Sequence, residues 1–241
     1  MSYLPILTYH RLLSRDPSPE ADPKRISVSR DQFRSHLGWF RRLGYRSLRL
    51  EDYVRSLQRA EPAPARSLAI TFDDGYEEVF SLGLPVLQEF GFTATVFAVP
   101  GEERNRWDDG NARLMNPGEL RQWLDAGMEI GSHTSHHVHL TQIDREGAKR
   151  ELMESKHLLE AATGRPVTLL AYPYGETNDT VEALARGAGY EAAFSTDHAP
   201  PDHSRNLFRL RRPVIFPRNT LWEIFVKAQR WYPSYQDWKR R

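Results

Sequence analysis

Short apolar runs that alternate with longer amphipathic segments are the feature that most constrains how this chain folds. Eight runs have the length and the β-branched content of buried strands, at residues 5–10, 45–50, 68–73, 93–100, 129–133, 168–172, 192–196 and 210–216. Several of the segments between them repeat apolar residues at helical spacing. This alternation is typical of an α/β fold, in which crossover helices join the strands of a parallel sheet.

Three connecting segments carry a clear helical pattern. Ser29 is the expected N-cap of a helix whose apolar residues are Phe33, Leu37, Phe40 and Leu43. Two further stripes consist of Ala148, Leu152, Ser155, Leu159 and Ala162, and of Val181, Leu184, Ala185 and Ala188, the second ended by Gly187 or Gly189. Such β/α units suit either a small barrel or a doubly wound sheet, and periodicity does not separate the two.

One domain is the simplest organisation for residues 1–241. The chain has no internal repeat or low-complexity tract, and the Pro/Ala-rich break at residues 61–65 is short enough to be a surface loop. The 33 basic and 32 acidic side chains leave a net charge of +1, which argues against a nucleic-acid partner. Because the chain has no cysteine, any metal must be held by His, Asp or Glu, and disulfides and a thiolate nucleophile are excluded.

The two ends of the sequence were inspected for signals of export and of membrane association. Residues 1–10 lack the regions of a signal peptide, and no apolar run reaches the roughly 18 residues of a transmembrane segment. We therefore expect no transmembrane segment, and a cytoplasmic location for the sequence as written. Residues 221–241 interleave aromatic and basic side chains, which is typical of a helix at a membrane surface; a last helix that docks on the sheet is the simpler interpretation.

Two carboxylates directly follow the third candidate strand. The segment LAITFDDGY runs from a buried-type strand into Asp73, Asp74 and Gly75. An ordinary Asp-Asp-Gly turn is an equally good interpretation of this segment alone. Neighbouring strand positions point to opposite sides, however, so one carboxylate can reach a metal while the other reaches a water molecule.

A histidine cluster follows another candidate strand. In GSHTSHHVHL, His133 and His137 are four residues apart and share one face if the segment enters a helical turn. A histidine-rich surface loop is the alternative. Together with Asp74, the two imidazoles would supply three ligands and leave a position for water, as in catalytic zinc sites. We expect His136 and His139 to be neighbours of that site rather than ligands.

A third polar turn follows the candidate strand at residues 168–172. The segment LLAYPYG ends in Tyr172, Pro173, Tyr174 and Gly175, which on their own indicate a proline turn with aromatic packing. Beside the other two motifs, the backbone N–H groups of this turn become candidates for stabilising a developing oxyanion.

The three motifs, in this order and spacing, resemble those of the polysaccharide deacetylase family, also called the NodB-homology domain or carbohydrate esterase family 4. They are TFDDG at residues 71–75, HTSHH at residues 133–137 with the trailing Leu140, and YPYG at residues 172–175. The motif core covers about residues 66–196, and PILTYH and FRLRRPVIF resemble the family's flanks. The YPYG motif is similar to that of poly-N-acetylglucosamine deacetylases. The resemblance implies a distorted (β/α) barrel of about seven strands.

The resemblance also implies roles for single residues. A divalent metal, usually zinc, with cobalt and nickel as alternatives, would be held by Asp74, His133 and His137. Asp73 would be the general base, and Tyr174 would donate its backbone N–H to the oxyanion. The implied reaction is hydrolysis of an N-acyl group, chiefly N-acetyl, from an amino sugar in a polysaccharide, an oligosaccharide or a lipid-linked glycan. The alternatives are a deformylase, a non-sugar amidase, and a carbohydrate-binding barrel that keeps the metal site without catalysis.

The chain departs from the family pattern at two places. Ala171 stands where the family commonly has the arginine that orients the base, and Arg211 and Arg212 are the candidates to replace it. The family's late catalytic histidine is also missing, since His203 is the last histidine of the chain. Relatives with the YPYG motif, which resemble the poly-N-acetylglucosamine deacetylases, use a histidine on the first strand in place of the late one. His10 matches that position, with a satisfied core histidine as the alternative.

Substrate contacts are expected first from the loop at residues 101–117, which is long for a β-to-α connection. Within it, Trp107 is placed to stack on a sugar and Asp108 to hydrogen-bond it, although a tryptophan in a loop is as often a packing anchor. Tyr172, Pro173 and Arg211 complete the expected substrate-binding residues.

Overall fold

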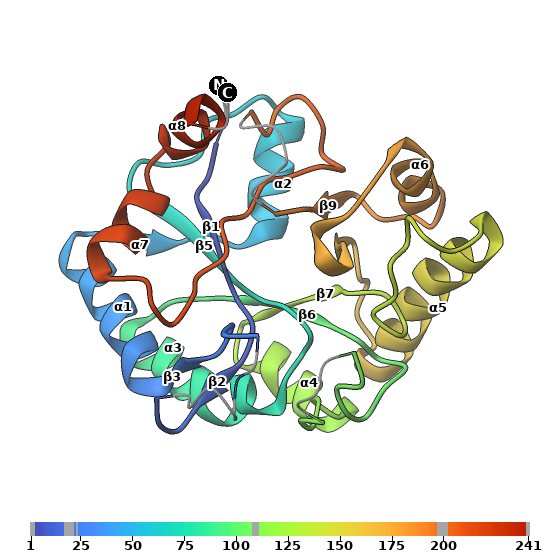
Figure 1. Ribbon diagram of the computed structural model, residues 1–241, viewed down its shortest axis with the longest axis horizontal. Helices are drawn as coiled ribbons and strands as arrows, with labels where there is room; N and C mark the ends of the chain where they lie inside the picture. The colour runs from blue at the N-terminus through green and yellow to red at the C-terminus, as the bar shows by residue number, and fades with distance from the viewer. Residues whose placement is uncertain (1–2, 17–21, 23, 108–110, 197–201, 240–241) are drawn as a thin grey trace.

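The computed structural model describes residues 3–16, 22, 24–107, 111–196 and 202–239, and in these residues a seven-stranded parallel sheet forms the centre of the molecule (Figure 1). Its hydrogen-bonded order is β1 (Ile6–Tyr9), β5 (Ser67–Phe72), β6 (Thr95–Ala98), β7 (Glu129–Ser132), β8 (Leu169–Ala171) and β9 (Ala192–Phe194), with the short β4 (Arg46–Ser47) also on β5. The parallel α/β architecture expected from the sequence is therefore confirmed.

The segment after β9 returns to the first strand and closes the sheet into a distorted barrel. Leu210 forms a parallel bridge to Phe194 of β9, and Val214 forms one to Thr8 of β1. Between them, the amide of Thr8 donates to the carbonyl of Pro213 at 3.0 Å. Because an open doubly wound sheet would leave its two edge strands apart, this closure selects the barrel.

Helices surround the sheet on its outer side (Figure 1). They are α1 (Arg30–Arg42), α2 (Leu50–Gln58), α3 (Leu84–Phe90) after a π-helical turn η1 (Val79–Gly83), α4 (Pro117–Asp125), α5 (Arg145–Thr163), α6 (Asp179–Gly187), α7 (Leu221–Lys227) and α8 (Tyr232–Lys239). A small parallel pair, β2 (Leu12–Leu13) and β3 (Val28–Ser29), lies beside α1. Among the described residues, no helix is both long and apolar enough to cross a membrane.

The predicted start of α1 is confirmed at the level of single hydrogen bonds. The Ser29 hydroxyl accepts from the amide of Gln32, and the Gln32 side chain accepts from the amide of Ser29, which is a complete capping box. Phe33, Leu37 and Phe40 form the buried stripe of the helix. The next helices with a clear sequence pattern, α5 and α6, also begin and end close to the predicted residues.

Two predicted strands are shorter than their sequence pattern indicates. Residues 45–50 contribute only β4, because Leu50 already begins α2. The amides of Leu50 and Glu51 donate to the carboxylate of Glu129 at 2.8 and 3.1 Å, so a side chain from β7 caps this helix. Residues 210–216 form only isolated bridges, because Pro213 has no N–H to continue a ladder.

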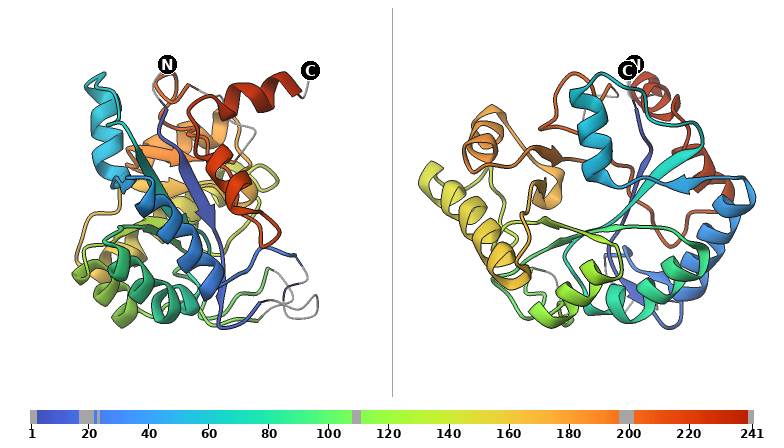
Figure 2. Two further views of the ribbon diagram at one scale, coloured as in Figure 1. Left: turned by 90° about the vertical axis from the view of Figure 1, so that its left-hand side faces the viewer. Right: turned by 180° about the vertical axis from the view of Figure 1, so that it is seen from behind.

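The carboxyl ends of the strands meet at one end of the barrel. Figure 2 shows β1 running from the end that carries the N-terminus toward the end that carries the segment around β2 and β3. In parallel α/β folds, this carboxyl end is where chemistry is found. The motif residues follow β1, β5, β7 and β8 at that end.

Candidate active site

The turn after β5 separates the two neighbouring aspartates. The amide of Asp73 still donates to the carbonyl of Tyr9 at 3.0 Å, which continues the pairing with β1. Asp74 and Gly75 both take left-handed conformations, with φ of 72° and 78°. A Cβ on Gly75 would lie 3.1 Å from the Cα of Ala98, so the position requires glycine in space as well as in conformation. The turn thus gives the two carboxylates different surroundings.

The turn after β7 brings His133 and His137 together, but not through a helical turn as the spacing predicts. Residues 133–137 are non-helical, and Thr134 and His137 have φ of 65° and 56°. These left-handed residues fold the segment back so that the two rings lie 4.9 Å apart at 67°. Gly101 makes room for the fold, since its amide donates to the carbonyl of Ser135 and a Cβ there would lie 2.5 Å from that oxygen.

Asp74, His133 and His137 converge as the predicted three-residue group. Nε2 of His133 lies 3.5 Å from Oδ1 of Asp74, and Nε2 of His137 lies 3.2 Å from the same oxygen. One ligand atom from each residue lies within 4.8 Å of the others, and all three residues are buried. The group therefore has the ligand types and the spacing of a metal site.

The protonation of these groups favours a cation between them. Nδ1 of His133 lies 2.8 Å from the carbonyl of Ala171, so it carries the proton and Nε2 presents a lone pair to Asp74. Burial lowers the pKa of His133 to about 4, so this ring is neutral at pH 7. Oδ1 of Asp74 is buried and has no hydrogen-bond partner among the described residues. Lone pairs that converge on a buried carboxylate oxygen fit a bound metal ion.

Asp73 lies beside this group and is paired with Arg212. Nη1 and Nη2 of Arg212 donate to Oδ1 and Oδ2 of Asp73 at 2.7 and 2.9 Å. Nη1 also contacts the hydroxyl of Thr71 at 3.2 Å, and the guanidinium lies 4.9 Å from the ring centre of Phe97. Burial alone would raise the pKa of Asp73, but the positive charge of Arg212 holds it below its ordinary value.

A cavity of about 250 Å³ opens onto these side chains. It is lined by His10, Lys24, Ile26, Asp73, Asp74, Trp107, His133, His137, Tyr174, Gly175, Thr196, Val214 and Phe216. His10 follows β1 directly, and its Nδ1 is buried without a hydrogen-bond partner in the described part of the chain. The predicted base, metal ligands and first-strand histidine therefore share one cavity.

Trp107 forms part of the wall of the cavity. Its ring stacks on His137, with ring centres 4.4 Å apart and planes 17° apart. Its carbonyl accepts from Nζ of Lys24 at 3.2 Å, and its amide donates to Asn105. The tryptophan thus packs against a predicted metal ligand, so one of its faces is occupied by protein.

The YPYG turn forms another side of the cavity. Pro173–Gly175 is a single 3-10 turn in which Tyr174 has a φ of 61°. The Tyr174 ring stacks on His139 at 3.7 Å and 6°, and meets His137 edge-on at 4.7 Å. Nδ1 of His139 lies 3.0 Å from Oε2 of Glu176. A Glu176–His139 pair thus packs against the aromatic ring of the turn.

The polysaccharide deacetylase family model matches residues 60–193, which is more than half of the chain. This chain belongs to the polysaccharide deacetylase family. The matched region contains the turns after β5, β7 and β8 that build the cavity.

Individual family members resemble the chain over most of its length. It is 25% identical over 214 residues to the candidate polysaccharide deacetylase YxkH of Bacillus subtilis, covering 89% of this chain and 72% of the relative. It is 24% identical to the poly-β-1,6-N-acetyl-D-glucosamine N-deacetylase of Staphylococcus epidermidis, with coverages of 92% and 81%. The solved structure of the Streptococcus pyogenes deacetylase PplD in complex with acetate superposes with a TM-score of 0.83 at 25% identity, covering 94% of this chain and 98% of that one.

Within this family fold, three of the expected substrate-binding residues do not line the cavity. The Tyr172 hydroxyl donates to the carbonyl of Phe208 at 3.0 Å, and the ring is buried. Pro173 is buried at the start of the turn. Nη2 of Arg211 donates to Gln236 on α8 at 2.8 Å. Asp108 lies outside the described residues.

Of the two arginines proposed to replace the family arginine missing at Ala171, Arg212 is the one that contacts the predicted base, Asp73. Arg211 and Arg212 are neighbours with identical side chains, so the sequence does not distinguish them. The signal that separates them is structural: Arg212 precedes Pro213 in the segment that closes the barrel between β9 and β1. Its guanidinium reaches Asp73 at the end of β5 from there.

Proposed function

We propose that this protein is a metal-dependent N-deacetylase that hydrolyses an N-acyl group, chiefly N-acetyl, from an amino sugar of a polysaccharide, an oligosaccharide or a lipid-linked glycan. The observation that carries the proposal is that the Asp74–His133–His137 group and Asp73 line one cavity, with both oxygens of Asp73 held by the buried Arg212. Family membership, and relatives named as N-deacetylases of poly-β-1,6-N-acetyl-D-glucosamine, support an amino-sugar amide as the substrate.

Asp74, His133 and His137 would hold the metal ion. One carboxylate and two imidazoles suit zinc, and cobalt or nickel would fit the same donors. When bound, such an ion polarises the amide carbonyl and lowers the pKa of water toward about 7. The hydrogen bond from His133 to Ala171 fixes the ring that offers its Nε2.

Asp73 acts in this proposal as the general base. An amide is a poor electrophile, so the attacking water must lose a proton as it adds to the carbonyl. Arg212 keeps Asp73 ionised at neutral pH and fixes both of its oxygens, so that the carboxylate takes this proton without first having to lose one. Arg212 itself is fully buried and is a positioning residue.

His10 and Tyr174 complete the reaction. The departing amine needs a proton, and His10 supplies it from the end of β1, where its ring lines the cavity. The backbone N–H of Tyr174 stabilises the tetrahedral oxyanion, as the YPYG turn places this residue at the cavity wall. The lining residues Val214, Phe216 and Ile26 give the acyl group an apolar surface.

We also propose that residues 1–241 act as one catalytic domain. Support comes from the barrel closure, since the segment at residues 210–215 hydrogen-bonds to β1 near the other end of the chain. Arg212 from this segment meets Asp73 at the end of β5, and Val214 and Phe216 line the same cavity as Asp73, so both parts of the chain contribute to it.

Release of acetate from N-acetylglucosamine oligomers tests the function. We expect turnover by metal-loaded protein, its loss with a chelator, and its return with zinc, cobalt or nickel. Asp73→Asn should abolish turnover, and His10→Ala should remove most of it while metal content stays unchanged. Formate release from N-formyl substrates would identify a deformylase instead. If metal-loaded protein turns over no acyl donor of any kind, the enzymatic proposal fails.

A further inference from the structure

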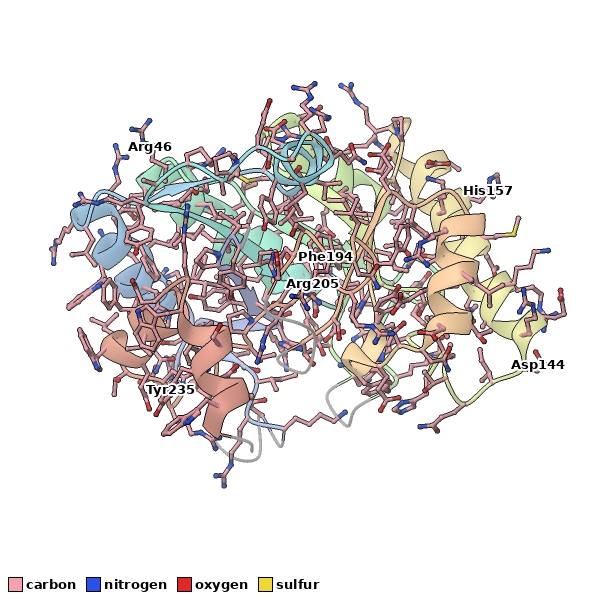
Figure 3. The ribbon with its side chains drawn as sticks, turned by 90° about the horizontal axis from the view of Figure 1, so that it is seen from above. Arg46, Asp144, His157, Phe194, Arg205 and Tyr235 are labelled. Atoms are coloured by element: carbon pink, nitrogen blue, oxygen red, sulfur yellow. The ribbon has the colours of Figure 1, made fainter. Side chains whose placement is uncertain are left out.

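The last helix carries its aromatic residues on the outside. Trp231, just before α8, and Tyr235 and Trp238 within it are four and three residues apart, which places them along one side of the helix. Their exposed fractions are 53%, 44% and 71%. Figure 3 shows Tyr235 at the periphery of the molecule, far from the core residue Phe194. We refer to these three residues as the aromatic stripe.

The inward side of α8 is polar. Gln236, partly buried, accepts from Nη2 of Arg211 at 2.8 Å and donates to the hydroxyl of Tyr232 at 2.6 Å. Most surface helices bury their apolar side, whereas Tyr235 and Trp238 of α8 are exposed and Gln236 makes its inward hydrogen bonds. A helix that docks through hydrogen bonds and leaves two tryptophans in solvent has an unused apolar surface.

The composition of this surface matches a lipid–water interface. Trp and Tyr combine an apolar ring with a polar N–H or O–H, which suits the headgroup level of a bilayer. Residues 217–241 contain six basic and two acidic side chains, a net charge of +4, whereas the whole chain carries +1, so the other residues together carry −3. Arg230, which directly precedes Trp231, is exposed, whereas Lys227 is buried. The part of the sequence that carries the aromatic stripe is thus net positive, which complements anionic lipid headgroups.

The aromatic stripe lies away from the cavity. Just before it, Nη2 of Arg230 donates to the carbonyl of Ala63 at 2.8 Å, and Gln229 donates to the hydroxyl of Tyr45. Ala63 and Tyr45 precede β5 and β4, so this region packs at the amino ends of the strands. The cavity lies at their carboxyl ends, and Figure 2 shows α8 beside the N-terminus at the other end of the molecule. Contact through α8 would leave the cavity open to solvent.

We propose that the aromatic stripe docks on the surface of an anionic phospholipid bilayer. A sugar chain stacked along all three rings fits less well, because the planes of Trp231 and Tyr235 are 84° apart, although those of Tyr235 and Trp238 are 32° apart. If the proposed function holds, a deacetylated amino-sugar product is also cationic and is repelled by this region. A second copy of the chain would carry the same positive charge against itself.

Co-sedimentation with lipid vesicles tests the proposal without measuring activity, so its failure is separate from a failure of the proposed function. The probes are vesicles of phosphatidylcholine alone and vesicles with one third phosphatidylglycerol, at low and high salt. The test variant is Trp231→Ser/Tyr235→Ser/Trp238→Ser, and the single Trp238→Ser keeps the test valid if the triple variant fails to fold. The matched control is Ile143→Ser/Met153→Ser, which removes exposed apolar side chains around α5.

We expect the unmodified protein to bind the anionic vesicles at least tenfold more tightly than the neutral ones, and less tightly at high salt. The triple variant should lose at least tenfold in affinity, Trp238→Ser severalfold, and the control should bind as the unmodified protein does. Equal binding to both vesicle types, no binding, or unchanged binding by both stripe variants would overturn the proposal. Two other results would likewise assign the surface to another partner. They are dimerisation that depends on the aromatic stripe, and binding of glucosamine oligomers by the stripe in the absence of vesicle binding.

Discussion

Arg212 and Asp73 form a buried, two-point ion pair that joins the segment closing the barrel to the end of β5. The pair spans 139 residues of sequence. It performs two tasks, since the positive charge keeps the carboxylate ionised and the two parallel hydrogen bonds fix its orientation. Because Ala171 offers no arginine from β8, the orientation of Asp73 depends on the barrel closure.

Replacing Arg212 should therefore change the pH dependence of the reaction as well as its rate. In Arg212→Lys, the planar two-point contact is lost, and we expect kcat to fall by about 10²-fold. In Arg212→Met the pKa of Asp73 rises, because burial is no longer opposed by that positive charge. A base must be deprotonated to act, so the acidic limb of the kcat/KM profile should move to higher pH.

The neighbouring arginine provides the control for that experiment. Arg211 is also buried, but its guanidinium donates to Gln236 on α8, whereas that of Arg212 donates to Asp73. Arg211→Met can lower stability, yet it should leave the acidic limb where it is. An equal shift of the limb in both variants would mean that the profile reports general destabilisation and not the Asp73–Arg212 pair.

The metal content of single variants should distinguish the ligand histidines of the second motif from its other histidines. His133→Ala and His137→Ala each remove one of the three proposed ligands, and we expect metal affinity to fall by at least 10²-fold with loss of turnover. His136→Ala is the matched control, because His136 contacts Glu151 on α5 and is partly exposed. Metal per chain after dialysis, measured by elemental analysis, should stay near one for the unmodified protein and for His136→Ala. Full retention of metal by His137→Ala would remove this residue from the ligand set.

Zinc should also stabilise the folded protein. The three ligand groups come from two separate turns, so the unfolded chain does not present them together. Ligand binding to the folded state adds about 2.7 kcal/mol at a free concentration one hundredfold above Kd. We expect the Tm to rise on addition of zinc to chelator-treated protein, and Asp74→Asn to lose most of that rise. A variant that binds no metal but shows the same rise would indicate that zinc acts elsewhere.

Much of the site was predictable because its residues lie at the carboxyl ends of strands. Asp73, Asp74 and His133 follow directly on runs that the sequence identifies as strands, and parallel strands bring their carboxyl ends together. The turn that brings His137 to His133 was not predictable, since positive φ is uncommon outside glycine and is rare for a β-branched residue such as Thr134. The helical turn that the four-residue spacing indicates is absent for that reason.

Contacts between segments that are distant in the sequence could not be predicted either. Local periodicity does not predict which buried arginine contacts Asp73. It also does not predict that Glu129 caps α2 from 79 residues away. Residues 45–50 have the composition of a strand, yet Leu50 begins a helix because a buried carboxylate accepts its amide. Tertiary contacts decided these assignments over local propensity.

His139 should affect turnover without affecting metal content. Its ring stacks on Tyr174, and its Nδ1 lies 3.0 Å from Glu176, so it supports the turn that contributes the proposed oxyanion donor. His139→Leu removes both contacts, and we expect kcat to fall about tenfold with KM and metal content nearly unchanged. His139→Phe keeps the stacking and should recover most of kcat. If the leucine and phenylalanine variants are equally active, the stacking on Tyr174 plays no part in positioning the turn.

Stability should fall in mild acid because two histidines are buried away from the cavity. Burial lowers the pKa of His36 to about 4 and that of His203 to about 3, against about 6.5 in the unfolded chain. Between pH 6.5 and these values the unfolded chain binds more protons than the folded one, so the free energy of unfolding decreases as pH falls. Each histidine contributes up to about 1.4 kcal/mol per pH unit. His203 contacts the Tyr53 hydroxyl and the amide of Arg211, which hold its neutral ring in place.

Urea unfolding at pH 7 and pH 5 measures this slope. His203→Gln keeps an acceptor for the Arg211 amide but does not titrate, so it should be less stable at pH 7 and lose less stability on acidification, by about 1 kcal/mol per pH unit. The control His157→Gln replaces an exposed histidine on α5 and should leave the slope unchanged. If His203→Gln keeps the full slope of the unmodified protein, proton uptake by the unfolded chain at this residue is not what weakens the fold in acid.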